Sequence, residues 1–194
     1  MKLPKEQIFE IFKETNALLE GHFVLTSGLH SPQYFQCAKV LQYPKYLHLL
    51  AGDIASHYEY SEVELVISPA VGGIVVGTEV GRVLGVRTIF AEREGGSMKI
   101  RRGFEIRKGE RVLIVEDVVT TGGSVDEIIG LVADAEAKVV GVGCIVDRSS
   151  GKANFNAKFY STMEMDVKTF PADAVPEWLA QIPVSKPGSR DLKK

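Results

Sequence analysis

The sequence predicts an α/β fold in which a central, mainly parallel sheet is flanked by helices. Several expected strands are continuous runs of Val, Ile and Leu rather than alternating patterns. Such runs are typical of strands that are buried on both faces of a parallel sheet. Segments with helical periodicity separate most of these strands, as crossover connections require. At 194 residues, 45% hydrophobic and 25% charged, the chain has the size and composition of one globular domain.

The N-terminal part is expected to begin with a helix. Pro4 is tolerated in a first helical turn, and apolar residues recur at helical spacing, so residues 4–20 are predicted to form an amphipathic helix that ends at Gly21. Two strand-like pieces follow, around a Ser-Gly and a Ser-Pro turn. Pro44 then opens a second helix. Its apolar face carries Leu47, Leu50, Ile54 and Ala55.

Strands and helices alternate from residue 63 onward. The expected strands are 63–68, 86–92, 111–116 and 138–147, and the expected helices are 73–84 and 124–136. The charged connection between Glu92 and Glu110 contains a Gly-Gly pair, and connections of this length are often functional lids or mobile hairpins. After Asp147 the pattern predicts two short strand-like pieces, KFYST and MDVKTF, then a helix over 171–182 and a Pro/Gly/Lys tail.

Composition disfavours two classes of partner. The formal net charge of -2 lacks the basic surplus of a nucleic-acid-binding protein, and the basic cluster from Lys186 onward is expected to be a solvated end. No stretch approaches the roughly 20 apolar residues of a membrane span, and the N-terminus has no hydrophobic signal core. Cys37 and Cys144 form no CxxC motif, which favours a reducing compartment. We therefore expect a cytoplasmic protein without nucleic-acid or membrane partners.

The most informative stretch is RVLIVEDVVTTGGSV, residues 111–125. If its apolar run is a central strand, Glu116 and Asp117 emerge at the carboxyl end, where open α/β sheets bind ligands. The small residues that follow would point backbone N–H groups at one spot beside a helix N-terminus, which makes a phosphate cradle. Carboxylates repel phosphate but accept hydrogen bonds from sugar hydroxyls, so the pattern indicates a sugar phosphate. The alternative is an acidic helix cap beside a plain glycine turn.

This stretch resembles the PRPP-binding motif of the type I phosphoribosyltransferases. The resemblance implies that Glu116 and Asp117 hold the ribose hydroxyls and that the turn amides hold the 5'-phosphate. A second segment, from Ser68 to Gly73, resembles the pyrophosphate loop of the family, in which a strained or cis peptide is expected, although its glycines would also suit a plain helix entry. The PRPP-binding residues implied are Glu116, Asp117, Val118, Val119, Thr120, Thr121, Gly122, Gly123 and Ser124, with Ala70, Val71, Gly72 and Gly73.

The segment from Phe23 to Phe35 is similar to the part of the orotate phosphoribosyltransferases that forms a hood over orotate. Orotate carries a carboxylate, which the planar guanidinium of an arginine binds through two parallel hydrogen bonds. Arg148 follows an expected core strand, at a place where the family has such an arginine. Taken alone, Arg148 would be interpreted as an arginine of a surface loop. The orotate-binding residues implied are Thr120, Arg148, Tyr34 and Phe35.

The resemblance implies one domain over 1–194. Its core would span about 43–150, its hood about 1–42 and 151–194, and a flexible loop about 93–103 would reach into the neighbouring subunit of a homodimer. The implied reaction transfers the 5-phosphoribosyl group from PRPP to orotate, gives orotidine 5'-monophosphate and pyrophosphate in pyrimidine biosynthesis, and requires Mg²⁺, held mainly through PRPP. The alternatives are a phosphoribosyltransferase for a purine, xanthine or uracil base, and a non-catalytic PRPP-sensing regulator.

The chain departs from the family in its cations. The family commonly has lysines where Thr26 and Ser97 stand, and another near Gly72. Cationic assistance to the leaving group must therefore come from another side chain of the flexible loop. The candidates are Arg93, Lys99, Arg101 and Arg102. Glu116, Asp117, Lys99 and Arg93 are assigned to catalysis.

Overall fold

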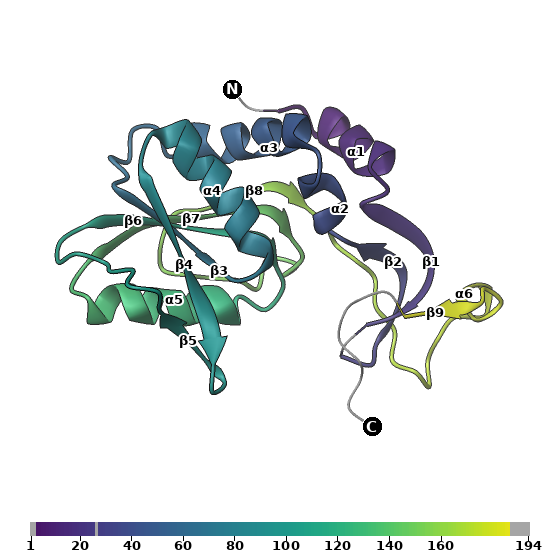
Figure 1. The fold of residues 1–194 in the computed structure, drawn as a ribbon. Coiled ribbons are helices and arrows are strands. Elements are labelled where there is room, and N and C mark those ends of the chain that lie inside the picture. The colour runs from purple at the N-terminus through teal and green to yellow at the C-terminus, as the bar shows by residue number, and fades with distance from the viewer. Residues whose placement is uncertain (1–2, 26, 187–194) are drawn as a thin grey trace.

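The computed structural model describes residues 3–25 and 27–186. These residues form a six-stranded sheet with helices on both faces and a separate three-stranded sheet to one side (Figure 1). Thr26, where the family commonly has a lysine, lies outside the described residues. Most of the basic tail, which follows Lys186, lies outside them as well.

The six-stranded sheet confirms the predicted fold class. Its order is β5-β4-β3-β6-β7-β8, and every neighbouring pair is parallel except β4 with β5. The strands are β3 Leu65–Pro69, β4 Arg87–Glu94, β5 Ser97–Ile100, β6 Arg111–Val119, β7 Lys138–Asp147 and β8 Phe159–Glu164. Strand β8 falls in the range 151–194 that was expected to belong to the hood, but it pairs with β7 in the large sheet.

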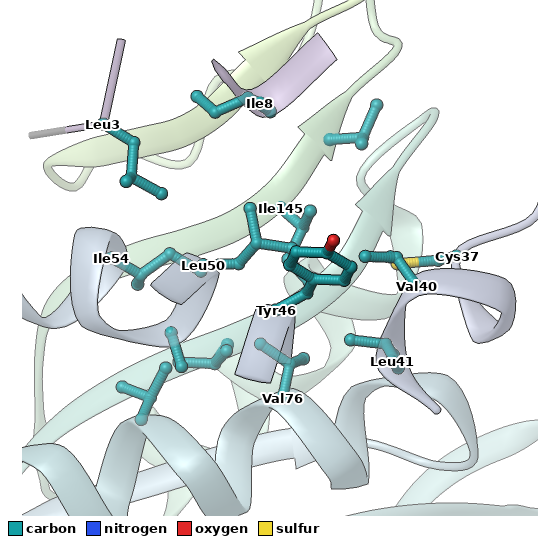
Figure 2. Packing of buried hydrophobic residues seen from close by; sticks show 14 of the residues in the cluster. Leu3, Ile8, Cys37, Val40, Leu41, Tyr46, Leu50, Ile54, Val76 and Ile145 are labelled. Carbon is teal, nitrogen blue, oxygen red and sulfur yellow. The ribbon is translucent and has the colours of Figure 1, made fainter. Parts of the chain in front are cut away.

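Helices cover the sheet on both faces, as the buried strand pattern requires. Helices α1 Lys5–Glu14, α3 Pro44–Ser56 and α4 Gly72–Leu84 lie on one side, and α5 Gly123–Asp134 lies on the other. In β6, Leu113 and Val115 pack towards α3 and α4, whereas Val112 and Ile114 pack towards α5. Figure 2 shows the apolar cluster on the α3 and α4 side of the sheet from close by, with Leu50 and Ile54 of α3 and Ile145 of β7.

A three-stranded sheet forms the centre of the hood. Its order is β2-β1-β9, with β1 Leu18–Val24, β2 His30–Phe35 and β9 Val184–Ser185. The prediction of a helix over 4–20 was wrong at its C-terminal end. The hydroxyl of Thr15 donates to the carbonyl of Ile11 at 2.7 Å, and Asn16 has a left-handed φ of 52°, which ends the helix. Gly21 therefore lies inside β1, at an irregularity in its pairing with β2.

Three shorter elements also differ from the sequence expectation. Helix α2, Ala38–Leu41, was not expected. The segment from Met165 to Phe170 contains no strand and makes one isolated bridge, from Phe170 to His30. The helix expected over 171–182 is reduced to α6, Glu177–Ala180. Pro176 explains the loss, because a proline cannot continue an earlier helix and disfavours helical geometry in the residue before it.

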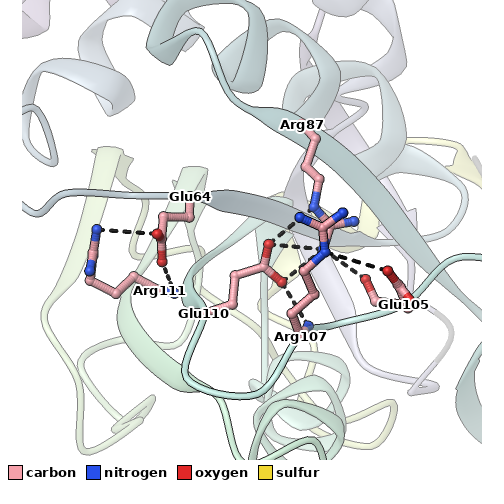
Figure 3. A network of polar contacts seen from close by, with 6 residues as sticks. All are labelled: Glu64, Arg87, Glu105, Arg107, Glu110 and Arg111. Carbon is pink, nitrogen blue, oxygen red and sulfur yellow. Dashed lines mark hydrogen bonds and ion pairs between the residues drawn. The ribbon is translucent and has the colours of Figure 1, made fainter.

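A polar network lies at the end of the sheet where the parallel strands begin, opposite their carboxyl ends (Figure 3). Arg87 donates to both carboxylate oxygens of the buried Glu110, at 2.7 and 2.9 Å, and the backbone N of Arg107 donates to the same carboxylate at 2.9 Å. Arg111 pairs with Glu64 beside them. The network holds the last residues of the 101–110 connection in place where the chain enters β6.

Candidate active site

The two acids of the 111–125 stretch lie within β6 rather than after it, one strand away from the 70–73 loop. A Cβ atom added at Gly72 would lie 2.3 Å from Asp117 Oδ2, and one added at Gly73 would lie 3.2 Å from Glu116 Oε1. Each carboxyl group therefore packs against one glycine, and side chains larger than hydrogen would displace the acid at Gly72. The structure thus brings the acids and the predicted pyrophosphate loop together.

Glu116 is buried, and its Oε1 accepts a hydrogen bond from the backbone N of Asp117 at 3.0 Å. Burial raises the pKa of Glu116 well above its usual value, and the adjacent Asp117 carboxyl adds to the rise. The ionised form of Glu116 is therefore unfavourable until hydroxyl donors or a cation stabilise it. Asp117 is less buried and lines a large cavity.

The TTGGS turn connects β6 with α5 and forms a small hollow. Gly122 takes a left-handed φ of 86° as the N-cap residue of α5, and a Cβ atom there would lie 2.8 Å from the ring of Phe155. The residues that line the hollow, of about 50 Å³, are Glu116, Val118, Val119, Thr120, Thr121, Gly122, Gly123, Ser124 and Val125. The positive end of the α5 dipole and the free amides of its first turn favour an anion here.

The 70–73 loop carries the cis peptide that was expected, between Ala70 and Val71. The backbone N of Ala70 donates to the carbonyl of Ala91 in β4 at 2.8 Å, which ties the loop to the neighbouring strand. Val71 is 81% exposed. The loop therefore presents its backbone to solvent beside the acid pair, and it does not contribute to the wall of the large cavity.

A cavity of about 820 Å³ lies between the core and the hood. Seven of the residues assigned to PRPP or orotate line it, namely Tyr34, Phe35, Asp117, Val118, Thr120, Thr121 and Arg148. Thr120 and Arg148 follow β6 and β7, whose last residues Val119 and Asp147 are paired in register. The two residues assigned to orotate on the core side are therefore neighbours across adjacent strand ends.

The backbone at Arg148 is fixed by the neighbouring strand ends. Its backbone N donates to the carbonyl of Val119 at 2.8 Å, and Asp147 Oδ1 accepts from the backbone N of Ser149 at 2.7 Å. The Nε atom of Arg148 is buried and has no hydrogen-bond partner in the described residues. Burial also lowers the pKa of Arg148. A half-buried guanidinium whose buried Nε lacks an acceptor fits a planar carboxylate ligand.

The predicted flexible loop is a β-hairpin formed by β4 and β5, because Arg93 pairs with Met98 and Glu94 with Ser97. All four candidate cations of this hairpin contact acids of the same chain. These ion pairs are Arg93–Glu127 at 2.6 Å, Lys99–Glu94 at 3.1 Å, Arg101–Glu94 at 3.3 Å and Arg102–Glu92 at 2.7 Å. None of the four lines the large cavity or the TTGGS hollow. In this conformation Arg93 and Lys99 are held apart from the acid pair.

Several cavity residues were not found from the sequence. They are Leu25, Ser27, Leu29, Gln36, Cys37, Ser149, Ser150, Lys152, Val167 and Thr169. Lys152 lies only four residues after Arg148, so the sequence could have indicated it as a second charged residue near the base site. Val167 and Thr169 reach the cavity because the bridge between Phe170 and His30 brings their segment to the hood, and no local pattern encodes that contact. Cys37 is a free thiol, and burial, followed by the charge of Asp117, raises its pKa.

Within residues 3–25 and 27–186, no group of three or more His, Cys, Asp or Glu side chains is placed to hold a metal ion. Glu116 and Asp117 provide only two carboxyl groups. This set fits a Mg²⁺ ion whose oxygen ligands come mostly from a bound phosphate ester and water. In the same part of the chain, no helix has the length and apolar character of a membrane span.

Comparisons with known proteins agree with this geometry. Residues 40–178 match the family model described as a phosphoribosyl transferase domain. A protein of Chlorobium phaeobacteroides (strain DSM 266) named orotate phosphoribosyltransferase is 54% identical over 183 residues, which cover 94% of this chain and 95% of the relative. One with the same name from Thermoanaerobacter sp. (strain X514) is 50% identical over 188 residues, which cover 97% of this chain and 99% of the relative.

Solved structures show the same fold at lower identity. The orotate phosphoribosyltransferase of Aeropyrum pernix has a TM-score of 0.69 at 24% identity, over 80% of this chain and 92% of that chain. An adenine phosphoribosyltransferase of Rhodothermus marinus has a TM-score of 0.65 at 18% identity, over 83% of this chain and all of that chain. Because the fold is shared by enzymes named for different bases, the fold by itself does not identify the base.

Proposed function

This chain belongs to the orotate phosphoribosyltransferases, and from that premise we propose the reaction and the role of each site residue. The enzyme transfers the 5-phosphoribosyl group of PRPP to orotate, which yields orotidine 5'-monophosphate and pyrophosphate in the synthesis of UMP. One observation supports orotate as the base above all others. Arg148 is half-buried in the wall of the cavity, next to Thr120, and its buried Nε atom has no hydrogen-bond partner among the described residues.

PRPP binds across the ends of β3 and β6. The amides of Thr120 to Ser124 hold its 5'-phosphate at the N-terminus of α5. Glu116 and Asp117 accept hydrogen bonds from the ribose hydroxyls, and the backbone of residues 70–73 faces the pyrophosphate group. Support comes from the contact of both carboxyl groups with Gly72 and Gly73, because a ligand held by the acids must then lie beside that loop.

Orotate binds in the cavity, with its carboxylate on Arg148 and its ring between Thr120 and the hood residues Tyr34 and Phe35. The ring atom N1 forms a bond to C1 of the ribose as the bond from C1 to the pyrophosphate oxygen breaks. Pyrophosphate leaves with that electron pair, and the N1 proton is released. Since the ribose carries positive charge in the transition state, as in other glycosyl transfers, the chain contributes chiefly by positioning and by charge stabilisation.

Glu116 and Asp117 would help to hold a Mg²⁺ ion bound mainly through PRPP oxygens, since no described group of three or more His, Cys, Asp or Glu side chains could hold it alone. When bound, the ion would offset the negative charge of the pyrophosphate group. The residues of this chain determine where the pyrophosphate group lies, and therefore where its counter-ion lies.

The β4–β5 hairpin supplies further cations and closes over the site. Lys99 and Arg93 stabilise the leaving pyrophosphate once their ion pairs with Glu94 and Glu127 are exchanged for phosphate. We also propose that the protein is a cytoplasmic homodimer in which the 93–103 region serves the neighbouring site. Mixing an Asp117→Asn subunit with an inactive hairpin variant should restore activity if sites are shared, and light scattering should give twice the chain mass.

Two other functions would use the same PRPP site. A phosphoribosyltransferase for purine, xanthine or uracil would keep the acids and the turn, but these bases offer no carboxylate to Arg148. A non-catalytic PRPP-sensing regulator would bind PRPP without turnover. Neither explains a half-buried arginine whose Nε lacks an acceptor as directly as orotate does.

The deciding experiment follows the loss of orotate absorbance in the presence of PRPP and Mg²⁺. We expect orotate to be consumed, with one pyrophosphate formed for each orotate, and uracil, adenine, hypoxanthine and xanthine to be used at least about a hundredfold less efficiently, because a buried charge would be left unpaired. Consumption of another base in preference to orotate would reject the proposed substrate. PRPP binding without turnover of any base would favour the regulator.

A further inference from the structure

Helix α5 carries an acid whose contacts are not explained by the fold alone. Glu127 lies one helical turn after Gly123, where α5 begins. Its Oε1 accepts from Arg93 Nη2 at 2.6 Å, and its Oε2 accepts from Arg93 Nη1 at 3.3 Å and from the backbone N of Met98 at 2.7 Å. One carboxylate thus holds both strands of the β4–β5 hairpin against the helix that begins at the TTGGS turn.

The other end of the hairpin segment is fixed independently. Glu110 binds Arg87 and the backbone of Arg107 at the far edge of the sheet. The ion pairs of Glu92 and Glu94 lie within the hairpin region itself. Beside the apolar packing of Met98, Glu127 is a polar contact that joins the hairpin to the ligand-facing end of α5, and it does so through the guanidinium of a predicted catalytic arginine.

Arg93 contacts α5, which begins at the TTGGS turn, and belongs to the strand that holds the 70–73 loop. It follows Ala91 by two residues in β4, about 7 Å along the strand and with its side chain on the same face. The carbonyl of Ala91 accepts from the backbone N of Ala70 at 2.8 Å, at the start of the 70–73 loop. The Arg93 side chain is 42% exposed. Because this side chain is partly exposed, Arg93 can leave Glu127 as the hairpin closes over the neighbouring site proposed above.

We propose that Glu127 is a positioning residue that competes with the pyrophosphate group of PRPP for Arg93. In the free enzyme the carboxylate occupies the guanidinium with the two-pronged geometry that a phosphate would use. When PRPP binds, Arg93 transfers from Glu127 to the pyrophosphate group, and when pyrophosphate leaves, Glu127 takes Arg93 back. Glu127 accordingly weakens PRPP binding and assists product release. This inference rests on the proposed function, since it requires PRPP in the 70–73 loop.

The charge state of Glu127 suits this exchange. Its hydrogen bonds from Arg93, and then from the backbone of Met98, lower its pKa below the usual range of a carboxyl group. Glu127 is therefore ionised at neutral pH and remains a competitor for the guanidinium. A carboxylate that served only to hold the hairpin would support activity, so the two roles predict effects of opposite sign on PRPP binding.

The test is a double-mutant cycle. Glu127→Gln keeps an oxygen that can accept from Met98 N and has the same helix propensity, but it removes the ion pair. Asp126→Asn is the matched control, because it removes one charge from the same turn of α5, and Asp126 has no ion pair with Arg93. Arg93→Met and the double variant Arg93→Met/Glu127→Gln complete the cycle. The measurements are calorimetric affinity for PRPP with Mg²⁺, and inhibition by pyrophosphate in the orotate assay.

We expect Glu127→Gln to tighten PRPP binding and to lower the inhibition constant of pyrophosphate, each by about two- to fivefold, the range that an exposed ion pair supports. Asp126→Asn should leave both within experimental error, and the double variant should bind PRPP as Arg93→Met does. Unchanged or weaker binding by Glu127→Gln, or the same gain in the Arg93→Met background, would overturn the inference.

The outcome for the wild-type protein separates this inference from the proposed reaction. If wild type binds PRPP but consumes no orotate, the reaction is rejected and the affinity cycle still decides the role of Glu127. If wild type does not bind PRPP, both are rejected.

Discussion

The two walls of the cavity differ in how they are built. The core wall consists of the end of β6 and the TTGGS turn, with the 70–73 loop beside the acid pair, and it continues a strand whose apolar residues are fully buried, such as Leu113 and Ile114. The hood wall rests on a three-stranded sheet in which β9 has two residues and Val184 is 52% exposed. Regions with few buried contacts open at lower free energy than a packed core. We therefore expect the proposed sugar-phosphate half of the site to be the more rigid one and the end of the hood near β9 to adjust more readily.

The sharpest way to break this comparison is Asp117→Asn, in the core wall. The amide cannot accept from two ribose hydroxyls as the carboxylate does, so we expect kcat/KM for PRPP to fall by about 10²–10³-fold. Steady-state kinetics with saturating orotate would measure it. Asp134→Asn, near the far end of α5, is the control. Turnover close to wild type for Asp117→Asn would remove this residue from the ribose site.

The next largest effect concerns Arg148, at the end of β7 on the core side of the cavity. Arg148→Lys keeps the charge but loses the planar pair of donors, and we expect kcat/KM for orotate to fall by about a hundredfold while PRPP affinity changes by less than about twofold. Kinetics at varied orotate and calorimetry with PRPP would separate the two. Arg107→Lys, at the opposite edge of the sheet, is the matched substitution. Equal losses for both substrates would mean that Arg148 serves the whole site rather than the base.

A single methyl group should disturb the core wall by a smaller amount. In Gly72→Ala the added Cβ would lie 2.3 Å from Asp117 Oδ2, so the carboxyl group must shift. We expect the KM for PRPP to rise by about tenfold. Gly130→Ala in α5 is the control, because a Cβ atom there meets nothing within 4 Å, and the helix should be slightly stabilised. An unchanged KM for Gly72→Ala would show that the rigidity ascribed to this wall is wrong.

The smallest effect is one of pH on stability. Because burial raises the folded-state pKa of Glu116, the folded state binds this proton more tightly, and its contribution is fully present below the unfolded value of about 4.3. It is lost as pH rises towards the folded pKa. We expect Glu116→Gln to melt increasingly above wild type from pH 5 to pH 8, by roughly 2–4 °C per kcal/mol. Scanning calorimetry without ligand measures this. A difference that stays constant with pH would contradict it.

The same difference between the walls determined what could be predicted from the sequence. The core wall is encoded locally, since a buried strand, two acids and a glycine turn are contiguous in residues 111–125, and the structure places them at one strand end. The hood wall depends on contacts between distant segments. Leu18 was predicted in a helix because its spacing is helical, but Asn16 reverses the chain, and Val167 reaches the cavity through pairing of its neighbour Phe170 with His30.

The cations lay between these cases. Arg93 and Lys99 were recognisable as charged residues of a long connection, but their ion pairs with Glu127 and Glu94 join separate turns and strands. A sequence pattern shows which charged residues are present but not which of them form ion pairs. For this reason the contact between Arg93 and α5 emerged only from the structure.

The pairing of β9 with β1 also has a consequence for biosynthesis. His22 Nδ1 donates a hydrogen bond to the carbonyl of Ile182 at 3.1 Å, across 160 residues of chain, and β9 follows directly. A ribosome delivers the whole core before it delivers the strand that completes the hood. Because a domain generally folds as a unit, the hood is expected to reach its final three-stranded form only after the residues of β9 have left the ribosome.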